Sequence, residues 1–525
     1  MSALAVVVAV LAAVTSLLRW QRVSQREHYL PGSVAVTAGR WLRRRPPNPV
    51  LGLAWLALVA GSIATTGDGG PTSASLGAGA AVLGGLFPLG LSPVGSPRLR
   101  PTRRALQQLA VAAVAGAAVV AAVGRLAGAG PAAALAPVVL GLAVDGAAWL
   151  NRPLERGVAA RFRRAADEKL ARSRPRVVAV TGSYGKTTVK NHVRDLVGTT
   201  FDTLASPASW NNQAGLSRAV NEQLSPGTEV FVAEMGTYGP GEIRALVEWL
   251  RPEVAVITAI GPVHLERMRT LEAIVEAKAE ILDGARVAVL CVDSPLLRDL
   301  ADRVAAGSAT ELWRVGSDPS AGGLDVLVSE DDLATGGAQG AEGAEGAALT
   351  VRVRGEVLAV LPRGELHPGN VACAVAVASA LGVDRRSLVA ALPRLGPTAS
   401  RSATTTTADG LTIVDDTFNS NPAGSAAALA TLGRRVGEGR RVVVTPGMVE
   451  LGPLQDEANQ RFAAEVAASG AELVVVGWTN RRALLAGHPG AVTVRDREAA
   501  RRWVRDQLGR GDGVLWENDL PDHYP

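Results

Sequence analysis

The chain has 525 residues, of which 47% are hydrophobic, and it carries a formal net charge of +5 at pH 7. That length allows several domains, and a mean hydropathy of +0.17 is high for a wholly soluble protein. The two cysteines, Cys291 and Cys373, are too few for a disulfide framework or a cysteine-rich metal site. We expect both to be buried as small hydrophobic residues in a reducing compartment.

Five apolar segments occupy the first 150 residues, and each is close to the ~20 residues that cross a bilayer as a helix. The segments are residues 3–18, 50–66, 76–94, 106–126 and 132–150. The first is not interpreted as a signal peptide, because it lacks a basic start and four more segments follow it. The sequence therefore predicts an all-α transmembrane region over residues 1–150, with about five helices.

Arginines are distributed unequally among the loops between these segments. The basic residues between the first two segments, and between the third and fourth, are Arg19, Arg22, Arg26, Arg40, Arg43, Arg44, Arg45, Arg98, Arg100, Arg103 and Arg104. The loops around Asp68 and Gly130 contain none. The positive-inside rule therefore predicts a multi-pass protein of the cytoplasmic (inner) membrane, with its amino terminus outside and everything after residue 150 in the cytoplasm. For Asp145 and Arg125, a functional role, snorkelling and a mutual pair all remain open.

Residues 151–176 form a strongly basic segment with a helical pattern. Directly after a membrane span, such a segment is typical of a juxtamembrane helix on anionic lipid headgroups. A nucleic-acid patch is the competing interpretation, but the segment lacks interleaved aromatic residues. We therefore expect the membrane, and no nucleic acid, as its partner.

A phosphate-binding loop follows the basic segment. Residues 177–180 are a β-branched run typical of a buried strand. The next residues match the shortened phosphate-loop pattern GxxGKT: Gly182, Ser183, Tyr184, Gly185, Lys186 and Thr187. Thr188 follows the pattern and is a further candidate for the nucleotide site. In such a loop backbone N–H groups cradle phosphates, Lys186 reaches the terminal phosphates, and Thr187 offers its hydroxyl to Mg²⁺. A simple glycine turn is the alternative, but strand, loop and helix start occur in the order that nucleotide binding requires.

Lysine is rare in this chain, because 50 of the 54 basic residues are arginine. The four lysines are Lys169, Lys186, Lys190 and Lys278. An ammonium differs from a guanidinium in shape and in its ability to lose a proton, so a lysine here is a candidate for a specific task. Lys186 has such a task, and Lys278 requires one. Lys169 and Lys190 are interpreted as chance survivors on helix faces.

Short apolar runs alternate with helical stretches after residue 177, which predicts an α/β fold with a parallel sheet and helices on both faces. The runs are residues 229–233, 254–259 and 286–291, and then 411–415, 441–445 and 472–476. Low-complexity residues 317–348 are expected to form a surface loop on a small β insertion. We predict a P-loop-type central ATP-binding domain over 177–397 and a smaller, Rossmann-like carboxy-terminal α/β domain over 398–525.

Eight short motifs occur along the chain in a characteristic order. They are "TGSYGKTTVK", "WNNQAGL", "EMGTYGPGEI", "ITAIGPVHLERM", "EAKAEIL", "LHPGNVACAVA", "DDTFNSNP" and "GMVELG". Together they resemble the Mur ligase superfamily, and most closely its MurF branch, the UDP-N-acetylmuramoyl-tripeptide--D-alanyl-D-alanine ligases. The resemblance covers about residues 176–487.

This resemblance implies an ATP-dependent ligase that joins a carboxylate to an amine through an acyl phosphate, in peptidoglycan-precursor or related cell-envelope synthesis. Two Mg²⁺ ions are implied, since charge on the transferred phosphoryl group must be neutralised. Thr187 and Glu234 would hold the first ion, and His264 would help to hold the second. Taken singly, Glu234 could be a surface carboxylate and His264 a helix cap. Both follow successive strands, however, where open α/β sheets bind ligands.

Lys278 matches a lysine that CO₂ carbamylates in much of the superfamily, which turns it into an anionic ligand of the second Mg²⁺. Only an amine that can become neutral reacts in this way, and arginine cannot. Chance survival on a helix face is the alternative. The catalytic residues implied are therefore Lys186, Glu234, His264 and Lys278.

Three further residues match the nucleotide site of the family. Asn370 corresponds to an asparagine near the adenine. Arg401 and Asp416 correspond to residues of a carboxy-terminal domain that swings in and excludes water from the acyl phosphate. Asn419 and Asn421 could be functional or could be ordinary turn residues.

Three departures from the MurF type leave the acceptor open. Membrane spans replace the usual domain for the uridine-diphosphate sugar, Cys291 replaces an asparagine, and "GVLWENDLPDHYP" replaces the usual lysine-glycine-serine segment. The acceptor could be a muramyl peptide, soluble or lipid-linked, or a growing polymer as in membrane-bound poly-γ-glutamate synthases. The amine would come from an amino acid or a dipeptide.

Two other classes of protein remain compatible with parts of the sequence. A P-loop ATPase coupled to membrane transport would need polar residues inside the spans, and the spans contain few. A catalytically inactive scaffold would be expected to have lost one of the four catalytic residues, and all four are present. The sequence therefore favours a membrane-anchored ligase.

Overall fold

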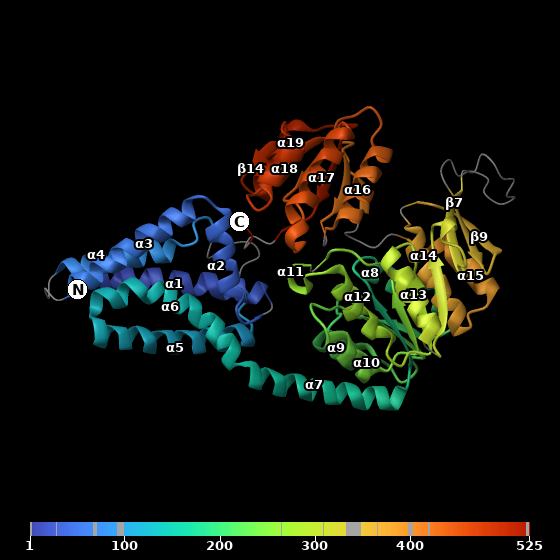
Figure 1. Ribbon diagram of the computed structural model, residues 1–525, viewed down its shortest axis with the longest axis horizontal. Helices are drawn as coiled ribbons and strands as arrows, with labels where there is room; N and C mark the ends of the chain where they lie inside the picture. Colours follow the sequence, from blue (N-terminus) through green and yellow to red (C-terminus); the bar gives the residue numbers. More distant parts are fainter. Residues whose placement is uncertain are drawn as a thin grey trace.

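The computed structural model describes residues 3–27, 29–66, 71–91, 99–263, 265–307, 309–331, 348–364, 366–396, 403–417, 420–520 and 524. A helical region comes first in the chain, a large mixed sheet with covering helices comes second, and a smaller sheet with its own helices comes last. Figure 1 shows the helical region on one side and the two sheet domains on the other, with one long helix running between them.

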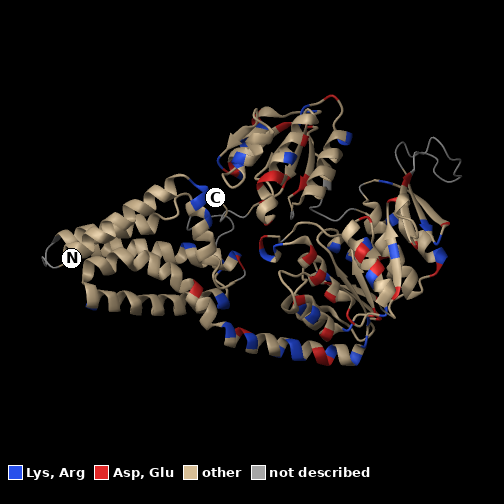
Figure 2. Ribbon diagram, in the orientation of Figure 1, with Lys and Arg blue, Asp and Glu red and all other residues tan. Residues whose placement is uncertain are grey.

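Most of the amino-terminal helices pack lengthwise against one another as a bundle, and the short helix α2 runs across the end of the bundle nearer the sheet domains (Figure 1). They are α1 (Ala3–Arg26), α2 (Ser33–Arg44), α3 (Pro47–Ala64), α4 (Pro71–Leu86), α5 (Arg103–Ala127) and α6 (Ala129–Leu150). By length and composition, four helices in the described part of the chain can cross a membrane: α1, α3, α5 and α6. The predicted span 76–94 overlaps α4, which has 16 residues and is shorter than a full span. Figure 2 shows that charged residues gather at the end of the bundle that faces the sheet domains.

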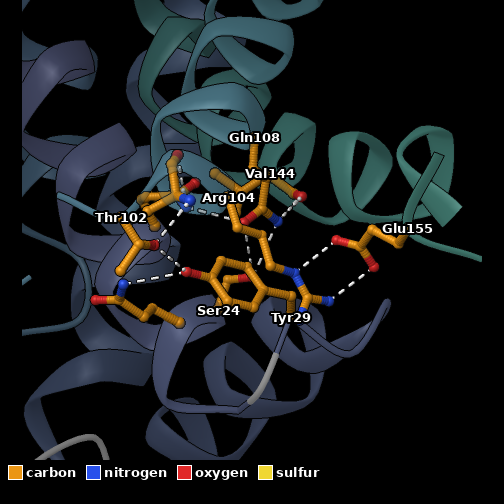
Figure 3. A network of polar contacts seen from close by, with 10 residues as sticks. Ser24, Tyr29, Thr102, Arg104, Gln108, Val144 and Glu155 are labelled. Carbon is orange, nitrogen blue, oxygen red and sulfur yellow. Dashed lines mark hydrogen bonds and ion pairs between the residues drawn. The ribbon is translucent and has the colours of Figure 1, made fainter. Parts of the chain in front are cut away.

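Polar side chains inside this end of the bundle bond to one another (Figure 3). Gln21 Nε2 donates to Gln108 Oε1 at 2.8 Å, and Gln108 Nε2 donates to Ser24 Oγ and to the Val144 carbonyl, both at 3.0 Å. Buried polar groups are costly unless they are hydrogen-bonded, so this network fixes how α1, α5 and α6 pack.

Asp145 has a structural task in the bundle. Its carboxylate accepts hydrogen bonds from the backbone N–H groups of Val34 at 3.1 Å and Ala35 at 3.0 Å. These N–H groups belong to the first turn of α2, where a carboxylate is favourable. Asp145 therefore caps α2, an arrangement outside the three alternatives that the sequence left open.

Helix α7 (Arg152–Ser173) connects the bundle to the central domain. Its 22 residues span about 33 Å. At one end Glu155 accepts two hydrogen bonds from Arg104 of α5, at 2.6 and 2.7 Å (Figure 3). At the other end Asp167 accepts from Trp249 Nε1 at 2.6 Å, and Ala166 is buried in the core of the central domain. The helix therefore acts as a strut between the two parts, and its contact with lipid headgroups stays a prediction.

The central domain contains a nine-stranded sheet in the order β2-β3-β1-β4-β5-β6-β7-β8-β9. Its strands are β1 (Arg176–Thr181), β2 (Thr203–Ala205), β3 (Val230–Glu234), β4 (Val254–Ile257), β5 (Val287–Cys291), β6 (Glu311–Gly316), β7 (Val326–Asp331), β8 (Ala348–Val353) and β9 (Glu356–Pro362). The strands from β2 to β7 are parallel, and β8 and β9 add an antiparallel edge. Residues 332–347 of the low-complexity segment lie outside the described residues.

Helices cover both faces of this sheet (Figure 1). They are α8 (Lys186–Val197), α9 (Gln213–Gln223), α10 (Glu242–Leu250), α11 (Leu265–Met268), α12 (Leu271–Ala279), α13 (Pro295–Gly307), α14 (Pro368–Leu381) and α15 (Arg385–Ala391). One hydrophobic core packs α8, α14 and α15 on one face, and a second packs α9, α10 and α13 on the other. The predicted α/β class with a parallel sheet is therefore confirmed. Cys291 and Cys373 are buried and free, as expected.

The carboxy-terminal domain has a six-stranded sheet in the order β10-β11-β15-β12-β13-β14, parallel except for β10. Its strands are β10 (Ala403–Thr406), β11 (Thr412–Asp416), β12 (Arg441–Thr445), β13 (Glu472–Val476), β14 (Val492–Val494) and β15 (Gly513–Glu517). Its helices are α16 (Pro422–Arg435), α17 (Gln455–Ala468), α18 (Arg481–Gly487) and α19 (Arg497–Gln507). Because β11, β15 and β12 are parallel neighbours, Asp416, Glu517 and Thr445 meet at the carboxyl ends of the strands.

Glu517 makes the stability of this domain depend on pH. Its side chain is fully buried, and it accepts hydrogen bonds from Thr445 Oγ1 and from Ser425 Oγ. Burial raises the pKa of Glu517 from 4.5 to about 7. A raised pKa means that the folded state holds the proton more tightly, so this contribution is fully present below pH 4.5 and is lost as pH rises to 7.

We expect Glu517→Gln to remove this dependence. Above pH 7 the variant should be more stable than the wild type by about 3 kcal/mol, and the difference should vanish near pH 4.5. Hydrogen-exchange mass spectrometry of peptides from β12 and β15 measures the opening free energy directly. A difference that stays constant between pH 4.5 and 8 would contradict the assignment.

Candidate active site

The loop between β1 and α8 has the geometry of a phosphate cradle. Gly182 has φ +153° and Gly185 has φ +76°. A Cβ at Gly182 would lie 2.1 Å from Thr258 Oγ1, and one at Gly185 would lie 2.4 Å from Asn370 Oδ1. Both positions therefore require glycine, and the N-terminal N–H groups of α8 follow directly, where phosphate binds favourably.

Neighbouring segments hold the loop in place. Ser183 Oγ donates to the Gly261 carbonyl at 3.1 Å and accepts from the Gly261 N–H at 3.0 Å. Tyr184 lies against Gly261, where a Cβ would come within 2.1 Å of its hydroxyl, and burial raises the pKa of Tyr184. The segment after β4 therefore fixes the first half of the loop.

Lys186 lies over the loop. Its Nζ donates to the carbonyl oxygens of Gly182 at 2.8 Å and Ser183 at 3.4 Å. The side chain is half-buried at the start of α8, and Thr188 follows in the same first turn. An ammonium in this position lies beside the backbone N–H groups that can donate hydrogen bonds to phosphate oxygens.

Glu234 is the charged centre next to the loop. It ends β3, which pairs with β1, and its side chain is 1% exposed. Thr187 Oγ1 donates to Glu234 Oε2 at 2.9 Å, and Asn211 Nδ2 donates to Oε1 at 3.1 Å. A hydroxyl and a carboxylate in contact are oxygen donors of the kind that Mg²⁺ prefers.

Lys190 lies within the same group of side chains. It is 1% exposed, and its Nζ donates to Glu234 Oε2 at 3.2 Å. The interpretation of Lys190 as a chance survivor on a helix face is therefore wrong, because this face of α8 is turned toward β3. Lys169 donates instead to the carbonyl oxygens of Asn221 and Leu224, where α7 meets the central domain.

Lys278 reaches the loop from α12. Its Nζ donates to the Gly182 carbonyl at 3.1 Å, and the side chain is 3% exposed. Burial lowers the pKa of Lys278 well below its usual 10.5, and the positive charge of Lys186 lowers it further. The structure thus brings the amines of Lys186 and Lys278 to the carbonyl oxygen of Gly182. Because Lys278 is buried, its ammonium loses a proton more easily than an exposed lysine does.

The remaining predicted residues have mixed placements. Asn370, at the start of α14, contacts the loop beside Gly185. Asp416 ends β11 in the carboxy-terminal domain and is 8% exposed. His264 and Arg401 lie outside the described residues.

The two asparagines with open roles also differ. Asn421 Oδ1 accepts from the Gly424 N–H at 2.8 Å as the N-cap of α16, which supports its structural interpretation. Asn419 lies outside the described residues.

Two residues of this site, Lys190 and Asn211, were not predicted from the sequence. The rarity of lysine was a usable signal for Lys190, since it follows Lys186 by four residues, one helical turn. Asn211 belongs to the motif "WNNQAGL", but the sequence does not indicate that the turn before it approaches Glu234. Asn212 of the same motif has a structural role, because its Oδ1 caps α9 by accepting from the Gly215 N–H at 2.9 Å.

The donor set fits a metal ion that arrives with a nucleotide. Within the described residues there is no group of three or more His, Cys, Asp or Glu side chains that could hold a metal by themselves. Thr187 and Glu234 supply one hydroxyl and one carboxylate, and Mg²⁺ in nucleotide sites takes its other ligands from phosphate oxygens and water. The loop and the donors are therefore suited to nucleotide-borne Mg²⁺.

Comparisons with known proteins agree with this arrangement. Residues 180–377 match the family model for the Mur ligase middle domain, and residues 400–517 match that for the Mur ligase glutamate ligase domain. The UDP-N-acetylmuramoyl-tripeptide--D-alanyl-D-alanine ligase of Mycobacterium leprae is 30% identical over 372 residues, which cover 65% of this chain and 70% of that protein. The protein of the same name from Bacillus subtilis is 29% identical over 294 residues, or 55% of this chain and 60% of that protein.

Two solved structures share the fold of the part of this chain that they match. MurF ligase from Thermotoga maritima in complex with ADP has a TM-score of 0.57 and 25% identity, and the match covers 69% of this chain and 80% of that one. MurF from Acinetobacter baumannii has a TM-score of 0.58 at 22% identity, covering 69% of this chain and 77% of that one. The helical bundle and α7 precede both matched family regions.

Proposed function

This chain belongs to the Mur ligase family, and we propose that it is a membrane-anchored, ATP- and Mg²⁺-dependent ligase that joins a carboxylate to an amine. The reaction would belong to peptidoglycan-precursor or related cell-envelope synthesis. The observation that supports it most is the convergence of two lysines, a hydroxyl and a buried carboxylate on one glycine loop. Phosphoryl transfer requires such a set of charges around the terminal phosphate.

We propose that the reaction proceeds in two steps. A carboxylate oxygen of the acceptor attacks the terminal phosphorus of ATP, and ADP leaves. The amine then attacks the acyl carbon and loses a proton, and phosphate departs with the oxygen that the carboxylate supplied. Bound Mg²⁺ would neutralise charge on the phosphates.

The residues of this chain would bind and orient the reacting groups. The α8 N–H groups and Lys186 would hold the phosphates, while Thr187 and Glu234 would hold the first ion. His264 would help to hold the second, and Asn370 would lie near the adenine. These roles are supported by the family motifs and, for the described residues, by their position around the loop.

We further propose that Lys278 is carbamylated. Its neutral amine would attack CO₂, form an N–C bond and release a proton, which replaces a cation by an anion that can bind the second Mg²⁺. Burial favours this, because the lowered pKa of Lys278 makes the neutral amine accessible. Carbamylation would also explain why lysine and not arginine occupies this position.

Closure of the carboxy-terminal domain would complete the nucleotide site through Arg401 and Asp416. In this structure that domain contacts both other parts of the chain. The Glu266 N–H donates to the Glu450 carbonyl at 3.3 Å, and Arg44 of α2 donates to the Thr479 carbonyl at 3.2 Å. Movement of the carboxy-terminal domain would therefore change its contact with α2, at the end of the bundle that faces the sheet domains.

The acceptor would be a muramyl peptide, UDP-linked or lipid-linked, and the amine D-alanyl-D-alanine, as in the names of the relatives. A poly-γ-glutamate-like polymer is the alternative acceptor. A transport ATPase has less support, because Asp145 of α6 is engaged in capping α2.

Labelling the acceptor tests this reaction. With ¹⁸O in the carboxylate of a muramyl tripeptide, and with ATP and D-alanyl-D-alanine, released phosphate should contain one ¹⁸O atom for each amide formed. Phosphate without the label, released at the same rate, would mean simple ATP hydrolysis and would refute the acyl-phosphate route.

Membrane anchoring has its own test. The arginines at one end of the bundle support a cytoplasmic location for both sheet domains. With the amino terminus outside, this location requires α4 to cross the membrane together with the four long apolar helices. A reporter fused after Leu150 should be active only in the cytoplasm. One inserted near Asp68, which lies outside the described residues, should be active only outside. The reverse pattern would remove the catalytic domains from ATP.

A further inference from the structure

We propose that Lys190 is a positioning residue, which ties the Glu234 carboxylate to the turn at residues 206–212 and so sets the geometry of the Mg²⁺-binding edge. The inference rests on the proposed function only in assuming that Mg²⁺ binds here with a nucleotide. It assigns a task to a buried lysine that the phosphate loop itself does not use.

Helix geometry places Lys190 next to the metal donors. Lys190 follows Lys186 by four residues and Thr187 by three, so the three side chains share one face of α8. Its Nζ donates to Glu234 Oε2 at 3.2 Å, the same oxygen that accepts from Thr187 at 2.9 Å. A second bond runs from Nζ to the Ala208 carbonyl at 2.5 Å.

The second bond matters because Ala208 has an uncommon backbone. Its φ is +43°, a left-handed conformation that alanine adopts at a cost. The bond from Lys190 holds this turn. Three residues later Asn211 donates to Glu234 Oε1 at 3.1 Å, and Ser206 Oγ accepts from the Glu234 N–H at 3.2 Å.

Both oxygens of Glu234 are therefore fixed by groups that Lys190 connects. Oε2 is bonded to Lys190 directly, and Oε1 is bonded to the turn that Lys190 holds. Loss of one member of a buried ion pair leaves the other charge uncompensated, and loss of the turn would release Asn211 as well. Residues that orient metal ligands in this way tune metal affinity.

The same geometry explains the choice of lysine in an arginine-rich chain. An ammonium is a compact donor with three hydrogens, which suits two acceptors that approach from different directions. A planar guanidinium has its donors in a fixed fork and needs more room, and Lys190 is 1% exposed. We therefore expect Lys190→Arg to retain the positive charge but to lose the paired hydrogen bonds to Glu234 and to the Ala208 carbonyl.

Metal binding in the purified full-length protein tests the inference without requiring turnover. Mn²⁺ replaces Mg²⁺, and its dissociation constant in the presence of ADP is measured by electron paramagnetic resonance. Lys190→Met should raise that constant by about tenfold or more. The affinity of Lys190→Met for ADP in EDTA, where no metal is bound, should equal that of the wild type.

Two further variants make the outcome decisive. Lys169→Met is the matched control, because Lys169 also donates to backbone carbonyls but lies at α7, and it should bind Mn²⁺ normally. Lys190→Arg keeps the buried charge and replaces Lys190→Met as the test variant if Lys190→Met does not fold. Its dissociation constant for Mn²⁺ should also rise several-fold.

The possible results separate a positioning role from a structural one. Wild-type Mn²⁺ affinity in folded Lys190→Met or Lys190→Arg overturns the inference. Equal losses of ADP affinity with and without metal also overturn it, since they indicate a general structural role. Failure to detect an amide product would refute the proposed function, but would leave this metal-binding result standing.

Discussion

Lys186→Ala is expected to abolish ATP turnover while folding and membrane insertion stay intact. Lys186 lies over the phosphate loop with its ammonium 2.8 Å from the Gly182 carbonyl, where it would neutralise charge on the phosphates. Removing one preorganised donor of this kind costs roughly 10²–10³ in rate, and the loss of a full charge should reach at least the upper limit. The measurement is ADP release by the purified variant with saturating acceptor and amine.

A suitable control for this variant is Lys169→Ala, which removes another half-buried lysine from the contact of α7 with the central domain. It should keep its activity, and both variants should melt near the wild-type temperature. ADP release by folded Lys186→Ala at the wild-type rate would contradict the role assigned to the loop.

Lys278→Arg should lower turnover by orders of magnitude. Arginine keeps the positive charge and most of the length, but it cannot form a carbamate. The variant would lose an anionic ligand of the second Mg²⁺, and metal-based stabilisation of transition-state charge amounts to several kcal/mol. Turnover is measured at saturating Mg²⁺ so that weaker metal binding alone does not account for the loss.

Lys278→Ala provides the complementary result. It should be similarly inactive, and short carboxylic acids should partly restore turnover by supplying a surrogate anion in the vacated space. In the wild type, ¹³C-labelled bicarbonate should give a carbamate carbon signal that both variants lack. Near-normal turnover of Lys278→Arg would show that Lys278 is a structural residue.

The parts of the fold that the sequence predicts are those set by local patterns. The runs near residues 229–233 and 286–291 occur as β3 and β5, shifted by one residue at most, because short β-branched runs between helices are strong strand signals. The phosphate loop is predicted from Gly182, Gly185 and Lys186, because the residues that form it lie within a few consecutive positions.

The parts that the sequence does not predict depend on packing between distant segments. The burial of Lys190 follows from which face of α8 meets β3, and Asp145 caps α2 only because α6 passes its amino-terminal end. The contact between Asn211 and Glu234 requires the left-handed turn at Ala208, for which alanine gives no local signal.

Mass spectrometry of the reaction products is the most direct test of whether this protein forms an amide on a muramyl peptide. Full-length protein is incubated with ATP, Mg²⁺ and D-alanyl-D-alanine, together with a UDP-linked or a lipid-linked muramyl tripeptide. We predict that at least one acceptor gains the mass of the dipeptide minus one water, with one ADP formed for each product molecule. ATP consumption that yields ADP but no amide on either acceptor would contradict it.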